Sequence, residues 1–251
     1  MKIVKPSVSM RTKPSSNSML ETECLFGESV EVLSKERNWI LCKSLIDNYI
    51  GWVKRDGLGL LKAPTHRIIA QRTFLLTEKN EKKKCLHYLP IGAKVNVKKI
   101  EPNWTEIYLS NKHKFETAFL PSRDIVTINN KVKDWIGLAE QFHYTPYKWG
   151  GRDSMGIDCS ALLQLSQEAY GRNIPRNTVD QLEVYGKIIN QLSNLYRGCV
   201  IFWNGHVALM IDNLYCIHAN AFHMKVIIEP LDEVINRMPK SNKIIKMVDF
   251  N

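Results

Sequence analysis

No stretch of this 251-residue sequence is apolar for long enough to cross a membrane, although 44% of its residues are hydrophobic. The first 19 residues also lack the continuous apolar segment and the small-residue cleavage site of a secretory signal. We therefore expect a cytoplasmic protein that does not act in a membrane. The hydrophobic share is sufficient for packed cores, and the length allows one large domain or two to three small ones.

Paired cysteines are also missing, because the six cysteines form no C-x-x-C motif and have no regular spacing. In a cytoplasmic chain, we expect their thiols to be reduced. Cys199, His206, Cys216 and His218 could supply four zinc ligands, but they lack the spacing typical of structural zinc sites. Cys199 also lies in the apolar run 199–203, which is typical of a core strand. We expect no metal and no other cofactor.

The formal net charge of +10 is distributed unevenly. Residues 1–127 contain 22 Lys and Arg against 13 Asp and Glu, whereas residues 128–251 contain 13 against 12. The basic half shows neither a helical basic stripe nor an aromatic-interleaved RNA-binding motif. We therefore expect no nucleic-acid partner, although the charge is compatible with attraction to an anionic substrate or surface.

The first half contains a repeat with an offset of 65 residues, in which 27–40 aligns with 92–105. In both copies, alternating valines predict a half-buried strand, a polar turn follows, and a tryptophan opens the next strand. The matched pairs are Gly27 and Gly92, Val30 and Val95, Val32 and Val97, Asn38 and Asn103, and Trp39 and Trp104. The repeat predicts two small antiparallel β barrels of roughly 60 residues each.

The pattern "GE-x-V-x-V…W…GWV" of the first copy resembles that of tandem bacterial SH3-like barrels. The resemblance covers roughly residues 1–127, and in the second copy "ETAFLP" (116–121) replaces the final "GWV". We expect barrels at 1–62 and 63–127. A tandem of this kind can be a binding module or a scaffold that shapes a neighbouring site, and the sequence leaves both open.

From residue 128 the periodicity changes to that of an α+β domain, with helices first and antiparallel strands afterwards. Helices are predicted over 131–144, 158–171 and 178–186, and strands over 199–203, 206–212, 214–219 and 224–231. The predicted fold class is thus multi-domain: two all-β SH3-like barrels followed by an α+β domain at 128–251.

Cys159 falls at the start of the helix predicted over 158–171, behind a loop that contains Gly150, Gly151 and Gly156. An isolated cysteine is more often a small buried apolar residue than a nucleophile. At a helix start, however, the N–H groups and the helix dipole favour a negative charge, so we expect a pKa below the free value of about 8.5. Cys159 is therefore a candidate nucleophile.

A cysteine nucleophile needs a base, which is usually a histidine. His206 opens a predicted strand, and His218 lies on the next strand of the same hairpin. Either histidine alone is better explained as an ordinary strand residue. Together with Cys159, they suit a base, His206, and a residue that orients its imidazole ring, His218.

Four segments of the second half resemble the NlpC-type family of papain-like cysteine peptidases, which cleave the peptide stems of bacterial cell wall. They are "PYKWGGRDSMGIDCSALLQ" (146–164), "IPRNTVDQL" (174–182), "GCVIFWNGHVALMI" (198–211) and "CIHAN" (216–220). Two positions depart from the family pattern: Cys199 replaces an aspartate and Ala161 a glycine. The resemblance implies that Cys159 is the nucleophile, His206 the general base and His218 the third, orienting residue.

Two SH3-like barrels before such a domain, without a signal, resemble the γ-D-glutamyl-L-diamino acid endopeptidases of this family. The resemblance implies a small peptide substrate with a free N-terminal L-alanine and release of L-Ala-D-Glu, as in murein peptide recycling. It also implies a substrate amine pocket and groove, for which the candidates are Asp158, Ser160, Glu28, Tyr49, Trp149 and Thr178. Asp158 could instead be only a helix N-cap, and Trp149 could belong to the core.

Three other functions remain open at this point: an exported lysin that acts on intact wall, a non-catalytic module that binds peptide or wall polymer, and an acyltransferase on the same scaffold. The sequence does not decide between lysine and diaminopimelate at the third stem position, nor does it determine the oligomeric state.

Overall fold

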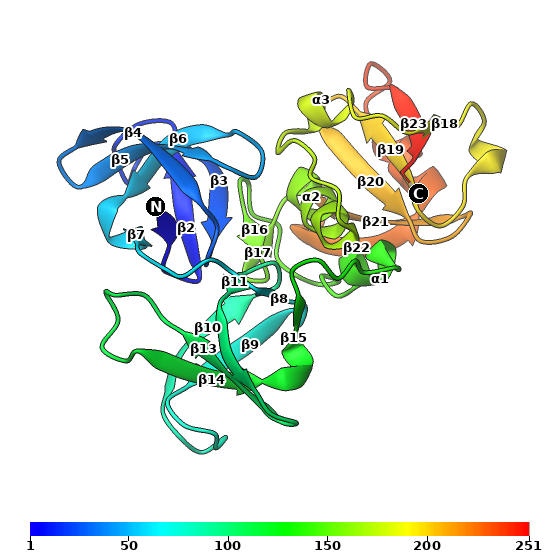
Figure 1. Ribbon diagram of the computed structural model, residues 1–251. Helices are drawn as coiled ribbons and strands as arrows, with labels where there is room; N and C mark the ends of the chain where they lie inside the picture. Colours follow the sequence, from blue (N-terminus) through cyan, green and yellow to red (C-terminus); the bar gives the residue numbers. More distant parts are fainter. Residues whose placement is uncertain (251) are drawn as a thin grey trace. The chain divides into compact units, whose positions relative to one another are not determined.

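The computed structural model describes residues 1–250, and most of its regular structure is β-sheet (Figure 1). The chain divides into two compact units, an N-terminal unit from Met1 to Asn130 and a C-terminal unit that begins at Lys131. No helix in the described part of the chain is both long and apolar enough to span a membrane. The predicted domain boundaries at 62 and 127 stay predictions.

The first part of the N-terminal unit is a small antiparallel barrel. Its five-stranded sheet has the order β3-β2-β6-β5-β4, and β1 pairs separately with β7. The strands are β1 (Lys2–Ile3), β2 (Ser7–Arg11), β3 (Leu20–Leu25), β4 (Val30–Glu36), β5 (Trp39–Ser44), β6 (Ile50–Lys54) and β7 (Leu58–Gly59), with a 3₁₀ turn, η1, at Arg55–Gly57. Alternate residues of β5 are buried, among them Ile40 and Cys42, as the period of two requires.

The second part of the N-terminal unit repeats this design with sheets of order β10-β9-β14-β13-β12 and β11-β8-β15. The strands are β8 (His66–Ile68), β9 (Arg72–Leu76), β10 (Cys85–Pro90), β11 (Lys94–Val95), β12 (Val97–Ile100), β13 (Trp104–Tyr108), β14 (Thr117–Pro121) and β15 (Ile125–Thr127), with a 3₁₀ turn, η2, at Ser122–Asp124. Trp39 and Trp104, which are matched in the repeat, each open a strand, and Gly27 and Gly92 have φ of 80° and 83°. The repeated sequence therefore takes the same local backbone path twice.

Phe26 joins the two barrels into one compact unit. It lies in the turn before β4 of the first barrel, yet it packs within the core of the second. The backbone N–H of Lys94 donates to the Phe26 carbonyl at 2.8 Å. A Cβ atom on the next residue, Gly27, would lie 1.8 Å from the Lys94 carbonyl oxygen, so this approach requires glycine.

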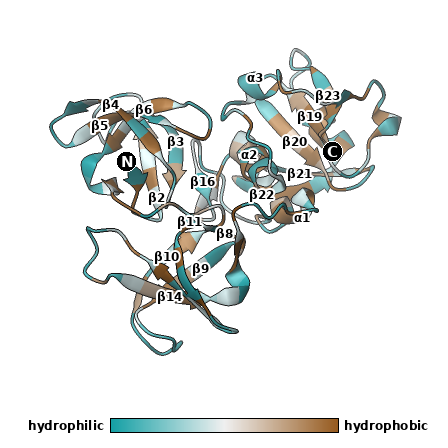
Figure 2. Ribbon diagram, in the orientation of Figure 1, coloured by the Kyte–Doolittle hydropathy of each residue, from teal (hydrophilic) through white to brown (hydrophobic). Residues whose placement is uncertain are grey.

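The C-terminal unit is built on a six-stranded antiparallel sheet of order β18-β23-β19-β20-β21-β22. Its strands are β18 (Lys187–Ile188), β19 (Cys199–Trp203), β20 (His206–Met210), β21 (Tyr215–Asn220), β22 (Lys225–Pro230) and β23 (Lys246–Asp249), and a separate hairpin pairs β16 (Arg152–Asp153) with β17 (Gly156–Ile157). The helices are α1 (Trp135–Glu140), α2 (Cys159–Tyr170), α3 (Thr178–Gln181) and α4 (Leu231–Arg237), with a 3₁₀ turn, η3, at Leu192–Asn194. Hydrophobic residues run along β19 and β20 at the centre of the sheet (Figure 2).

Helix α2 packs against β20 and β21 and positions the candidate nucleophile at its first residue. Asp158 is its N-cap, and Gly171 ends it with a φ of 96° in the left-handed region. The predicted helix 158–171 is therefore correct to one residue at each end. The helices predicted over 131–144 and 178–186 are shorter than expected, because Asp134 caps α1 only at Trp135 and α3 is a single turn.

Candidate active site

The sulfur of Cys159 lies at the junction between α2 and the start of β20. The backbone N–H of Val207 donates a hydrogen bond to it, and the Thr178 side chain makes a second hydrogen bond. Val207 directly follows His206, so the sulfur of the candidate nucleophile contacts the backbone next to the candidate base. Of the residues predicted for the groove, Thr178 is thus in contact with the candidate nucleophile.

The expected low pKa of Cys159 is wrong for the thiol taken by itself. The side chain is buried, and burial, followed by the charge of Asp158, raises the pKa to about 11. The hydrogen bonds from Val207 and Thr178 favour the thiolate but do not outweigh these effects. Helix position alone suggested a low value because the sequence did not show how deeply the sulfur is buried.

His206 and His218 form a direct hydrogen bond. Nε2 of His206 lies 2.7 Å from Nδ1 of His218, and the two rings meet edge to face with centroids 5.0 Å apart. Burial, and then the neighbouring His218, lower the pKa of His206 to about 3. The pKa of His218 is also lowered, chiefly by burial. The candidate base is therefore a neutral imidazole, and its Nδ1 is the ring nitrogen that does not contact His218.

A third buried group extends this pair, and the sequence did not reveal it. Glu229 on β22 places Oε1 2.7 Å from Nε2 of His218. Arg237 on α4 donates to the same oxygen at 2.5 Å, and His223 Nε2 lies 3.2 Å from Oε2. Burial opposes ionisation of Glu229, but the hydrogen bonds from His218, Arg237 and His223 lower its pKa to about 2. The sequence did not single out Glu229, because the segment 224–231 is mostly apolar and predicted only a strand.

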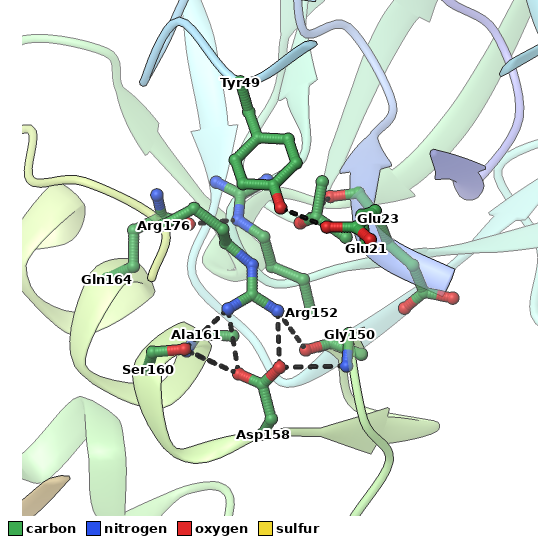
Figure 3. Close-up of polar contacts among 12 residues, drawn as sticks. Glu21, Glu23, Tyr49, Gly150, Arg152, Asp158, Ser160, Ala161, Gln164 and Arg176 are labelled. Carbon is green, nitrogen blue, oxygen red and sulfur yellow. Dashed lines mark hydrogen bonds and ion pairs between the residues drawn. The ribbon is translucent and has the colours of Figure 1, made fainter. Parts of the chain in front are cut away.

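Asp158 is held inside the C-terminal unit by a bidentate ion pair with Arg176 (Figure 3). The guanidinium donates to Oδ1 at 3.0 Å and to Oδ2 at 2.6 Å. The N–H groups of Ala161 and Gly150 donate to the same two oxygens, at 2.8 and 3.0 Å. Asp158 is thus both the N-cap of α2 and the anchor of the glycine loop, and a substrate ammonium would have to share its oxygens with these donors.

Ser160 is part of the same cluster, because its hydroxyl lies 2.7 Å from Arg176 and 3.2 Å from Oδ1 of Asp158. Trp149 is not a core residue, since 64% of its surface is exposed. Tyr147, in the same motif, was not singled out from the sequence. Burial, and then the negative charges of Cys159 and Asp158, raise the pKa of its phenol to about 12. A protonated hydroxyl near the sulfur can donate a hydrogen bond to an anion.

The two predicted substrate residues of the N-terminal unit have different surroundings. Glu28 is buried, and its Oε2 accepts the N–H of Leu25 at 2.9 Å, which closes the turn after β3. The Tyr49 hydroxyl donates to Glu21 (Figure 3). Glu21 is therefore a carboxylate beside Tyr49 that the sequence did not single out, and the roles of Glu28 and Tyr49 stay predictions.

Within residues 1–250, no group of three or more His, Cys, Asp or Glu side chains is arranged to hold a metal ion. Cys199 and Cys216 are fully buried in a hydrophobic cluster with Ile201 and Met210. The sulfur of Cys216 donates weakly to the Glu229 carbonyl at 3.8 Å. Of the four alternative zinc ligands, Cys199 and Cys216 are thus core residues, and His206 and His218 form the hydrogen-bonded pair.

Comparison with known proteins finds a family match in each half of the chain. Residues 144–240 match the NlpC/P60 family, and residues 10–58 match the bacterial dipeptidyl-peptidase Sh3 domain. A γ-D-glutamyl-L-lysine dipeptidyl-peptidase of Bacillus subtilis is 27% identical over 245 residues, which cover 87% of this chain and 78% of that protein. Dipeptidyl-peptidase 6 of Lysinibacillus sphaericus is 24% identical over 257 residues, which cover 92% of this chain and 91% of that protein.

A solved structure shares the fold over the full length of the chain. The crystal structure of an NlpC/P60 family protein from Bacillus cereus superposes with a TM-score of 0.83, at 20% identity, and covers 99% of this chain and 98% of that one. The predicted fold class, SH3-like β barrels before a papain-like α+β domain, is confirmed.

Proposed function

From an NlpC/P60 cell-wall peptidase domain preceded by a bacterial dipeptidyl-peptidase Sh3 domain, we propose that this chain is a cysteine endopeptidase for short stem peptides. The bond cleaved joins the γ-carboxyl of D-glutamate to the amine of an L-diamino acid, and L-Ala-D-Glu is released. The names of the two relatives support this specificity. The observation that carries the chemistry is the contact of Cys159 with Val207 beside the His206–His218 pair.

In acylation, the sulfur of Cys159 forms a bond to the γ-carbonyl carbon of D-glutamate while Nδ1 of His206 accepts the proton of the Cys159 thiol. Because burial favours both groups in their neutral forms, the proton transfer accompanies the attack instead of preceding it. The resulting oxyanion is stabilised by the backbone N–H of Cys159 at the start of α2 and by the phenol of Tyr147, which remains protonated.

The intermediate collapses as the C–N bond breaks and the imidazolium of His206 protonates the departing amine. The thioester on Cys159 is then attacked by water, whose proton returns to His206, and L-Ala-D-Glu leaves with a new carboxylate. The thiol is regenerated at the end of the cycle. Each step uses one proton at Nδ1 of His206, and His218 holds the other ring nitrogen throughout.

The test is incubation with L-Ala-γ-D-Glu-diaminopimelate and with its lysine counterpart, followed by mass identification of the products. We expect L-Ala-D-Glu and the free diamino acid. An N-acetylated tripeptide should be cleaved much more slowly, because an acetyl group removes the ammonium charge that the proposed specificity requires. Equal rates for both peptides, or release of peptides from intact wall, would replace this proposal with that of a lysin.

We place the activity in the cytoplasm, in the recycling of stem peptides that are already released from the wall. Support comes from the small size of the proposed substrate, which needs no contact with the polymer. Cell fractionation with an antibody against the chain tests the location. Recovery only from the medium or the wall fraction would contradict it.

A further inference from the structure

A chain of buried polar side chains continues beyond the three proposed catalytic residues. It runs from His206 to His218 and then to Glu229, with distances of 2.7 Å at both steps. His218 and Glu229 are 1% and 6% exposed, so water does not compete for these contacts. Arg237 holds the same carboxylate oxygen that His218 meets.

The identity of each partner determines where the protons lie. An ionised carboxylate can only accept hydrogen bonds, so Nε2 of His218 must carry the proton toward Glu229. Nδ1 of the neutral His218 is then an acceptor, and Nε2 of His206 must donate to it. This leaves the lone pair of His206 on Nδ1, which is the nitrogen that the proposed mechanism needs as a base.

Asn220 favours the opposite arrangement. Its Oδ1 accepts the N–H of His223 at 2.8 Å, which orients Nδ2 toward Nε2 of His218 at 3.0 Å. An amide N–H donor at that distance favours a His218 with its proton on Nδ1. In that tautomer His218 would donate to His206, and the proton of His206 would move to Nδ1, where it blocks the base. The carboxylate of Glu229 is the group that prevents this.

We propose that Glu229 is a positioning residue that selects the active tautomers of His218 and His206, with Arg237 fixing its carboxylate. The inference deepens the proposed function and rests on it for the reaction itself. Glu229 does not touch the substrate. It acts through His218, as the outer partners of other functional histidines do.

The experiment compares Glu229→Gln and Glu229→Asp with the unaltered protein and with Glu233→Gln. Glu233 lies on the exposed face of α4, so its substitution makes the same chemical change without touching the histidines. The tautomers are observed by ¹⁵N NMR of labelled histidines, and the reactivity of Cys159 by its rate of alkylation with iodoacetamide at pH 7. Neither measurement uses a substrate, so both remain informative if the stem peptide is not cleaved.

We expect Glu229→Gln to move the His218 proton from Nε2 to Nδ1 and to lower turnover and Cys159 alkylation by about 10- to 100-fold. Glu229→Asp keeps the negative charge, so it should retain the Nε2–H tautomer and recover part of both rates. Glu233→Gln should match the unaltered protein. If Glu229→Gln leaves the tautomers unchanged, or if it changes them without slowing alkylation, the proposal is wrong. Loss of activity with unchanged tautomers would show a merely structural role.

Discussion

Arg176 donates hydrogen bonds to both carboxylate oxygens of Asp158, at 3.0 and 2.6 Å, and Asp158 directly precedes Cys159 in the chain. This ion pair is buried on both sides, with Arg176 2% and Asp158 7% exposed. The same carboxylate caps α2 and accepts the N–H of Gly150. The helix that carries Cys159 and the loop in front of it are therefore fixed by one pair of charges.

Replacing Arg176 by methionine should destabilise the C-terminal unit by about 3–5 kcal/mol, because Asp158 would remain buried without its counter-charge. Urea unfolding followed by fluorescence measures the change. Arg123→Met is the matched control, since the Arg123 side chain is 89% exposed and should change the free energy of unfolding by less than about 0.5 kcal/mol. Equal effects of the two substitutions would contradict the structural importance of the pair.

Cys159→Ala should lower turnover by at least about 1000-fold while leaving the fold intact, because it removes the atom that forms the thioester in the proposed mechanism. The rate of dipeptide release and the circular dichroism spectrum measure these two effects. Cys85→Ala is the control, because Cys85 is an exposed thiol on β10 of the N-terminal unit. Retention of activity in Cys159→Ala would eliminate the nucleophile assignment and favour a different chemistry.

His218→Ala should reduce kcat by about 100-fold or more, because Nε2 of His206 loses its acceptor and the ring loses its orientation. His218→Asn retains an amide oxygen that can accept this hydrogen bond, so it should be less impaired. Steady-state kinetics on the tripeptide compare the two variants. If both were equally inactive, hydrogen bonding to His206 would not explain the requirement for His218.

The stability of the fold should decrease as the pH falls from about 6.5 toward 3, in part because of His206. Its pKa is about 3 in the folded chain and 6.5 in the reference state, so between these values the unfolded chain binds a proton that the folded chain does not. The free energy of unfolding therefore decreases as the pH is lowered through this range, and the contribution of His206 is lost only below about pH 6.5. Urea midpoints between pH 5 and 7.5 measure the slope. Glu229 adds little there, because its pKa is about 2 in the folded chain and 4.5 in the reference state, so its carboxyl is ionised in both. His206→Asn should give a shallower slope, and an unchanged slope would refute the assignment.

Local sequence signals located the barrels and the sheet well. Alternating valines and the recurring Gly and Trp placed β4, β5 and β13, because a strand period of two is visible in a few residues. The four strands from Cys199 to Pro230 were predicted within about two residues. Helix α4 and strand β23 were missed, since α4 directly follows β22 and both elements are short. Their stability comes from packing that sequence periodicity does not report.

The sequence by itself determined three local features: a cysteine at a helix start, two histidines on one hairpin, and an aspartate that caps the helix. Those features depend on neighbours in the chain or on one turn. Only the tertiary structure decided the charge states and the outer partners, because burial raises the pKa of Cys159 and lowers that of His206, and because Arg176 and Glu229 come from distant segments. Electrostatic effects of this kind depend on distance and solvent exclusion in three dimensions, which no local pattern of residues specifies.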